Sequence, residues 1–121
     1  MGIWLIYQIA KDTAMDAQKR YIEAQAKIFK ALGHPVRLLM ADALREGEKC
    51  VCELQALSGL DMSTVSKHLS LLREAGIVSA EKRGTSMYYR LSMCCLDSFL
   101  ACTAEMIQDH ALQQYSMIKG R

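Results

Sequence analysis

The sequence contains little of what interrupts regular secondary structure. Its 121 residues include one proline, Pro35, and seven glycines. A composition this poor in turn formers argues against a disordered linker and against a turn-rich β architecture. The apolar first ten residues are far shorter than the ~20 that span a bilayer, and they lack the basic leader of a secretory signal. We therefore expect one helix-rich domain in the cytoplasm.

Catalytic signatures are also missing. The chain has no glycine-rich loop, no paired acidic residues and no Cys/His arrangement that would activate a nucleophile. The net charge of +2 is too small to indicate a nucleic-acid partner by itself. The range 62–90 nevertheless has five basic residues against two acidic ones. We expect a binding protein, not an enzyme, with a local basic surface suited to phosphates.

Hydrophobic periodicity predicts four helices, a β-hairpin and a last helix. Asp61 is a good N-cap, and Gly76 suits the position after a helix. Residues 15–121 are expected to form a single domain. Residues 1–14 are expected to be an N-terminal extension, either disordered or foreign to the natural chain, with Met15 as the alternative start. The predicted helices cover about 13–32, 35–46, 52–57, 62–75 and 92–117, and the strands 77–81 and 86–91.

Two short helices joined by a turn at Gly59 predict a helix-turn-helix, whose second helix would enter a DNA major groove. The alternative is an ordinary solvent-exposed helix. The outward residues of this second helix are small or basic, and none is acidic, which suits close approach to bases or phosphates. The predicted DNA-binding residues on it are Ser63, Thr64, Ser66, Lys67, His68 and Ser70.

The predicted hairpin strengthens this interpretation. Lys82 and Arg83 fall at its tip, directly after the predicted reading helix. A basic β-wing at that place would reach phosphates or the narrow minor groove. Neighbouring residues of a strand point to opposite faces, so one of Tyr88 and Tyr89 is expected in the core. We assign Tyr89 to the DNA-binding set.

These stretches together resemble the ArsR/SmtB family of winged-helix, metal-sensing repressors, in its arsenite-responsive form. The similarity runs from about Lys27 to Leu91 and rests on AKIFKALGHPVRLLMADAL, CVCEL, DMSTVSKHLSLLREAGIVSAEKRG and YYRL. The resemblance implies a mainly α winged helix-turn-helix with a small β-hairpin wing. It also implies a homodimer formed by the terminal helices, with two reading helices about one DNA turn apart, ~34 Å.

The five cysteines carry the remaining chemistry. Their odd number and the helix-rich pattern argue against a disulfide framework, so we expect reduced thiols that prefer soft ions. The resemblance implies that Cys50 and Cys52 are two ligands of a three-thiolate arsenite site, whose third cysteine is replaced by Gln55. Candidate additional ligands are Cys94, Cys95 and Cys102.

Helix geometry limits these candidates, because Cys95 and Cys102 would lie about 10 Å apart along one helix. A site within one chain would therefore use at most one cysteine of the last helix, unless the start of this helix unwinds or two chains meet. The alternative is that Cys50 and Cys52 bind the ion together with a solvent or small-thiol ligand. The expected inducer is As(III) or Sb(III), with Cd(II), Pb(II) or Zn(II) as other soft or borderline ions. Two rival interpretations remain: a thiol redox or reactive-sulfur switch on the same fold, and a DNA-binding protein without a ligand.

Overall fold

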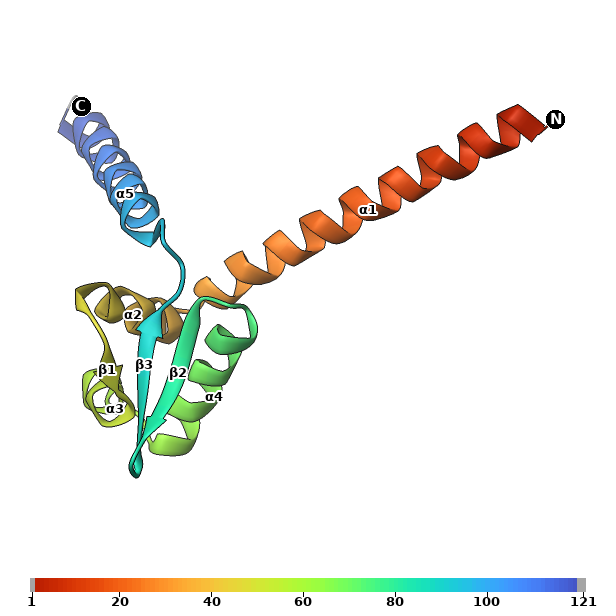
Figure 1. Ribbon diagram of the computed structural model, residues 1–121. Coiled ribbons are helices and arrows are strands. Elements are labelled where there is room, and N and C mark those ends of the chain that lie inside the picture. The colour runs from red at the N-terminus through yellow and green to blue at the C-terminus, as the bar shows by residue number, and fades with distance from the viewer. Residues whose placement is uncertain (1, 120–121) are drawn as a thin grey trace.

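The computed structural model describes residues 2–119 and shows a winged helix with two long helices leaving it (Figure 1). The compact part contains a short 3-10 turn, Leu44–Glu46, between its second helix and first strand. No helix among the described residues is long and apolar enough to cross a membrane. The elements are α1 (Gly2–Leu32), α2 (Pro35–Ala43), β1 (Lys49–Cys50), α3 (Val51–Ser58), α4 (Met62–Glu74), β2 (Val78–Arg83), β3 (Ser86–Leu91) and α5 (Leu96–Lys119).

Local signals in the sequence account for the boundaries of the short helices. His34 caps α2, its Nδ1 accepting a hydrogen bond from the Val36 amide at 3.1 Å, and Pro35 occupies the first helical position. Gly59 ends α3 in the left-handed conformation, with φ 71°, where a side chain would be strained. Asp61 then caps α4. The turn between α3 and α4 is therefore specified by adjacent residues.

The sheet has three antiparallel strands in the order β1-β3-β2. Strands β2 and β3 form the predicted hairpin, with Val78 opposite Leu91 and Arg83 opposite Ser86. Strand β1 was not predicted from the sequence. Only two residues long, β1 owes its existence to Lys49 and Cys50 pairing with Tyr89 and Tyr88, and two residues show no periodicity.

The core lies between α2, α3, α4 and the sheet. Met40, Leu54, Leu69 and Leu72 are fully buried in it. The core also takes Leu96, the first residue of α5, while partly buried Leu100 packs against it. The mainly helical winged helix-turn-helix predicted from the sequence is thus confirmed.

Both long helices begin elsewhere than predicted. Helix α1 starts at Gly2, so residues 2–14 continue the helix and do not form a separate disordered segment; Met1 lies outside the described residues. Helix α5 starts at Leu96, not near Ser92. The reason lies in the core, because the amides of Ser92 and Met93 both donate to the Ile77 carbonyl, at 2.8 and 3.3 Å. These bonds keep residues 92–93 out of the helix, and a turn at residues 94–95 precedes Leu96.

Outside the core, α1 and α5 project from the same side of the winged helix and diverge (Figure 1). Phe29 and Phe99, with ring centroids 5.8 Å apart, join them near their bases. Beyond that contact, both carry many exposed apolar side chains. These include Trp4, Ile6, Ile9, Tyr21 and Ile22 on α1, and Met106, Ile107, Leu112, Tyr115 and Ile118 on α5.

The burial pattern of α4 gives a direct test of the core. Leu69→Ala removes a side chain with no exposed surface, so we expect the free energy of unfolding in urea to fall by about 2–5 kcal/mol. Leu71→Ala is the matched control, because Leu71 lies on the same helix and is 45% exposed. Its effect should stay within about 0.5 kcal/mol. Equal losses in the two variants would contradict this packing.

Candidate functional site

Helix α4 presents a narrow polar face to solvent. Val65, Leu69 and Leu72 bury its opposite side completely. Four of the six residues predicted to bind DNA on this helix are exposed, and at 100° per residue they fall within about 100° of arc. They are Ser63, Ser66, Lys67 and Ser70. The exposed surface of α4 also includes Met62, Leu71, Arg73 and Glu74. The structure therefore brings four of the six residues predicted on this helix together on one surface, behind the turn that joins it to α3.

The start of this face is organised by Asp61. Its carboxylate accepts hydrogen bonds from the hydroxyls of Ser63 and Thr64, the latter at 2.6 Å, and from the Thr64 amide at 3.3 Å. These hydrogen bonds lower the pKa of Asp61 to about 2, and the one from Ser63 has the largest effect, with that from Thr64 next. Both hydroxyl hydrogens are thus committed to the helix cap. Thr64 is half-buried at the edge of the face.

His68 does not belong to the exposed face, contrary to its place in the predicted DNA-binding set. It is half-buried and stacks on His34, with ring centroids 4.6 Å apart. The Arg37 Nη1 lies 3.3 Å from its Nδ1. Arg37 also donates to the Ala31 carbonyl at 2.7 Å. This cluster joins α4 to the junction of α1 and α2, so we assign His68 a structural position.

At the wing tip, Arg83 is engaged within the protein. Its guanidinium forms a two-pronged ion pair with Glu48 and a further hydrogen bond to Glu81 at 2.9 Å. It also lies over the Tyr88 ring, 4.9 Å from the centroid. The hydrogen bonds to Glu48, and then to Glu81, raise the pKa of Arg83. Lys82 is exposed and forms no salt bridge with the described residues. It is an available cation close to the wing tip, and Arg90 on β3 is a second exposed cation, bonded to the Ser79 hydroxyl.

The two wing tyrosines take the opposite sides to those assigned from the sequence. Tyr89 packs against the hydrophobic core, whereas Tyr88 lies on the other face of the sheet beside Arg83. The alternation of strand residues was predicted correctly, but the expected orientation was wrong, because Tyr89 is the tyrosine that packs on the core. Contact of Tyr89 with DNA stays a prediction. Pairing with Lys49 decides the orientation, and β1 was not visible in the sequence pattern.

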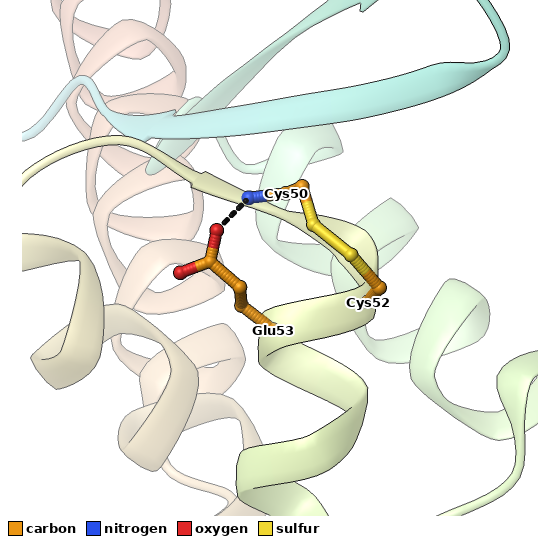
Figure 2. The surroundings of a disulfide bond; sticks show 3 residues. All are labelled: Cys50, Cys52 and Glu53. Carbon is orange, nitrogen blue, oxygen red and sulfur yellow. Dashed lines mark hydrogen bonds between the residues drawn. A yellow bond between two sulfur atoms is a disulfide. The ribbon is translucent and has the colours of Figure 1, made fainter.

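Cys50 and Cys52 are joined by a disulfide at the start of α3 (Figure 2). Cys50 is buried and caps the helix, and its amide donates to Glu53 Oε1 at 3.3 Å. Cys52 is exposed in the first turn. The expectation of reduced thiols is therefore wrong for this pair. The N-cap position and the first turn of α3 bring the two sulfurs within bonding reach. As a disulfide, the pair offers no thiolate to a metal ion.

The other three cysteines are free and exposed. Cys94 and Cys95 lie between β3 and α5 with their sulfurs 3.4 Å apart. A hydrogen bond with Cys94 raises the pKa of the Cys95 thiol. Cys102 follows two turns into α5. Within residues 2–119, no three His, Cys, Asp or Glu side chains are placed to hold one metal ion. The candidate ligands do not assemble within one chain.

Comparison with known proteins identifies the fold. Residues 34–80 match the bacterial regulatory protein arsR family. The biofilm growth-associated repressor of Xylella fastidiosa is 41% identical over 80 residues, which are 66% of this chain and 69% of that protein. The chain belongs to the ArsR family. It is accordingly a transcriptional regulator with a DNA-binding helix-turn-helix, and not an enzyme.

Two further relatives extend the comparison. The arsenic resistance transcriptional regulator ArsR1 of Pseudomonas putida is 45% identical over 65 residues, covering 53% of this chain and 51% of its own length. A homodimeric winged helix-turn-helix DNA-binding domain from Mycobacterium bovis has a TM-score of 0.70 and 28% identity, covering 79% of this ArsR-family chain and 89% of that one. The ArsR/SmtB assignment made from the sequence is confirmed.

Sequence reasoning missed the partners that hold these side chains. Glu48 was not singled out, although it carries the ion pair that fixes Arg83 to the base of the sheet. Arg37 was not singled out either, yet it bridges His68 and the end of α1. The Arg83–Glu48 and Arg37–His68 contacts each join residues more than thirty positions apart. No local pattern in the sequence indicates such contacts.

The histidine cluster predicts a pH dependence of stability. Burial, followed by the charges of His34 and Arg37, lowers the pKa of His68 from its ordinary value of 6.5. The unfolded chain therefore binds a proton at a higher pH than the folded one. The free energy of unfolding should fall as the pH drops below about 6.5 and level off below the folded pKa.

Chemical denaturation at pH values from 8 to 5 measures this effect. His68→Gln should flatten the decline relative to the unmodified protein. His110→Gln should leave it unchanged, since His110 is exposed on α5 and hydrogen-bonds only the nearby Gln114. An unaltered profile in His68→Gln would show that His68 protonates equally well in both states.

Proposed function

We propose that this ArsR-family protein is a homodimeric repressor that binds operator DNA when its thiols are free. In this proposal, capture of As(III) or Sb(III) by Cys50 and Cys52 releases the DNA. The observation that carries the proposal is the position of these two sulfurs, within bonding reach of one another at the start of α3. Helix α3 is the first helix of the DNA-reading unit.

DNA contact is assigned to α4 and the wing. The exposed hydroxyls of Ser66 and Ser70 suit close approach to a major groove, and Lys67 lies between them to bind a phosphate or a guanine edge. Lys82 extends the positive surface to the wing tip. Two copies related by a two-fold axis would present two such helices to half-sites about one turn apart, ~34 Å.

Dimerisation is assigned to α1 and α5. Their exposed apolar side chains exceed what a monomer usually leaves in water. The M. bovis domain of the same fold is homodimeric. A two-fold dimer held by these helices would set the distance between the two reading helices, which makes operator binding sensitive to small rotations of the winged helix.

Salt titrations of operator binding test the DNA surface. Lys67→Ala and Lys82→Ala should each weaken binding and reduce the slope of log K against log salt by about one. Arg83→Ala should change the slope much less, because two carboxylates already neutralise this guanidinium. A larger loss of slope in Arg83→Ala than in Lys82→Ala would contradict the assignment of the wing cations.

The thiol pair is suited to control because Cys50 belongs to two elements at once. It pairs with Tyr88 as the last residue of β1, and it caps α3. A ligand that draws Cys50 and Cys52 into a new geometry must alter the cap, the strand pairing, or both. Helix α3 packs against α4, so the change reaches the reading helix. A coupling free energy of ~1–3 kcal/mol between ion binding and operator binding suffices for useful control.

Arsenic and antimony suit this donor set because thiolates are soft ligands, and the P. putida relative is an arsenic resistance regulator. Two sulfurs leave a pyramidal As(III) site one ligand short. Gln55, one turn further along α3, cannot replace a thiolate. A small thiol from solution, or Cys94, Cys95 or Cys102 of the partner subunit or the same chain, would complete it. Cd(II), Pb(II) and Zn(II) are weaker candidates for the same thiols.

The disulfide favours a second candidate function, a redox-responsive repressor on the same fold. The Cys50–Cys52 bond exists between the two proposed ligands, so oxidation and ion capture compete for the same sulfurs. Under this alternative, operator affinity differs between the disulfide and dithiol forms without any added ion. The two functions therefore differ in whether a change of redox state, without any added ion, alters the affinity for the operator.

An operator-release titration separates the two. The fully reduced protein should bind DNA and lose at least about tenfold in affinity on adding arsenite, whereas Cys50→Ser and Cys52→Ser should bind DNA and ignore arsenite. Cys102→Ser is the comparison variant, since it tests a sulfur on α5. Protein oxidised at Cys50–Cys52 should not respond to arsenite.

Two outcomes decide against the main proposal. Release of DNA by arsenite from both Cys50→Ser and Cys52→Ser would show that the responsive site lies elsewhere. If oxidation alone releases DNA and arsenite has no effect on the reduced protein, the redox function replaces ion sensing.

A further inference from the structure

The first turns of α1 are apolar around the whole helix. Six of the seven residues from 3 to 9 are large and hydrophobic, and Gln8 is the exception. Each of the six is more than half exposed, with Ile3 at 87% and Trp4 at 68%. A helix that is hydrophobic on all sides belongs in a buried setting. Residues 3–9 together form the apolar tip of α1.

The protein's own core cannot cover the apolar tip. The first buried residue of α1 is Ala31, and at 1.5 Å per residue Trp4 lies about 40 Å from it along the helix. Figure 1 shows this end of α1 standing clear of every other described element. Whatever buries the tip must therefore come from another molecule.

The distal half of α5 has matching properties. Residues 106–118 expose Met106, Ile107, Leu112, Tyr115, Met117 and Ile118. They too lie beyond the reach of the core, with Ile118 about 33 Å along the helix from buried Leu96. Over their whole lengths the two helices have opposite charge balances, because α1 has five basic and three acidic residues and α5 has three acidic and one basic. The apolar tip itself has no charged residue, so its contact would depend on apolar burial.

We infer that the apolar tip of one protomer packs on residues 106–118 of α5 in a second copy of this chain. This inference rests on the proposed homodimer and adds a specific contact to it. Each tip would reach past its own winged helix and bury itself on the partner. The dimer would then be held at the far ends of its long helices, whereas the contact of Phe29 with Phe99 joins α1 to α5 within one chain.

Trp4 reports on this contact directly, because it is the only tryptophan in the sequence. Its emission should be blue-shifted at concentrations where sedimentation shows a dimer, and it should move to the red as dilution gives monomer. Leu112→Glu should raise the dimer dissociation constant at least about tenfold and red-shift Trp4 at a fixed concentration.

Ser98→Glu is the control, since it adds the same charge at an exposed polar position of α5 outside residues 106–118. Both substitutions are at exposed positions, so the winged helix should fold normally, as circular dichroism would verify. Ser98→Glu should leave the dimer and the emission of Trp4 unchanged.

The possible failures are distinguishable. A monomer at every concentration would overturn the proposed dimer itself. A dimer whose Trp4 keeps the emission of a water-exposed indole would overturn the tip contact alone, as would a buried Trp4 that Leu112→Glu does not affect. A blue shift that occurs only with phosphatidylcholine vesicles would assign the tip to a lipid surface and also overturn this inference.

Discussion

The burial of Val65, Leu69 and Leu72 beneath α4 is the constraint on which the rest of the molecule depends. These three side chains have no exposed surface, and their spacing of four and three residues fixes the rotation of the helix about its axis. That rotation directs Ser66, Lys67 and Ser70 outward. A change in the core under α4 would therefore alter the polar face as much as a substitution on the face itself.

Electrostatic contacts then separate four basic residues near the reading helix and the wing into two pairs. Arg37 and Arg83 hold elements together: one binds α1 carbonyls and His68, and the other joins the wing to Glu48. Lys67 and Lys82 have no such partner among the described side chains. The guanidinium group suits the first task because its planar donors bind two acceptors at once. Lysine, with a flexible stem and a single charge, suits contact with a phosphate backbone.

How much the sequence predicts depends on how local the determining contact is. The helices at 35–43, 51–58 and 62–74 follow from caps and periodicity, and so does the β-hairpin, because Asp61, Gly59 and Gly76 act on their immediate neighbours. Strand β1, the position of His68 and the inward turn of Tyr89 depend on partners distant in sequence. The start of α5 likewise depends on Ile77, which binds the preceding backbone. Periodicity carries no information on such contacts.

The cysteines illustrate the same limit in chemical form. Spacing identifies Cys50 and Cys52 as a pair, but only the structure places Cys50 at a joint between β1 and α3, buried and hydrogen-bonded through its backbone. A sulfur anchored in this way cannot move without disturbing the sheet or the helix, whereas its disulfide partner Cys52 is exposed. The pair thus combines an accessible sulfur with a structural one. Under the proposed function, this asymmetry would let chemistry at the surface of α3 act on the helix-turn-helix behind it, whether the reagent is an oxidant or a soft ion.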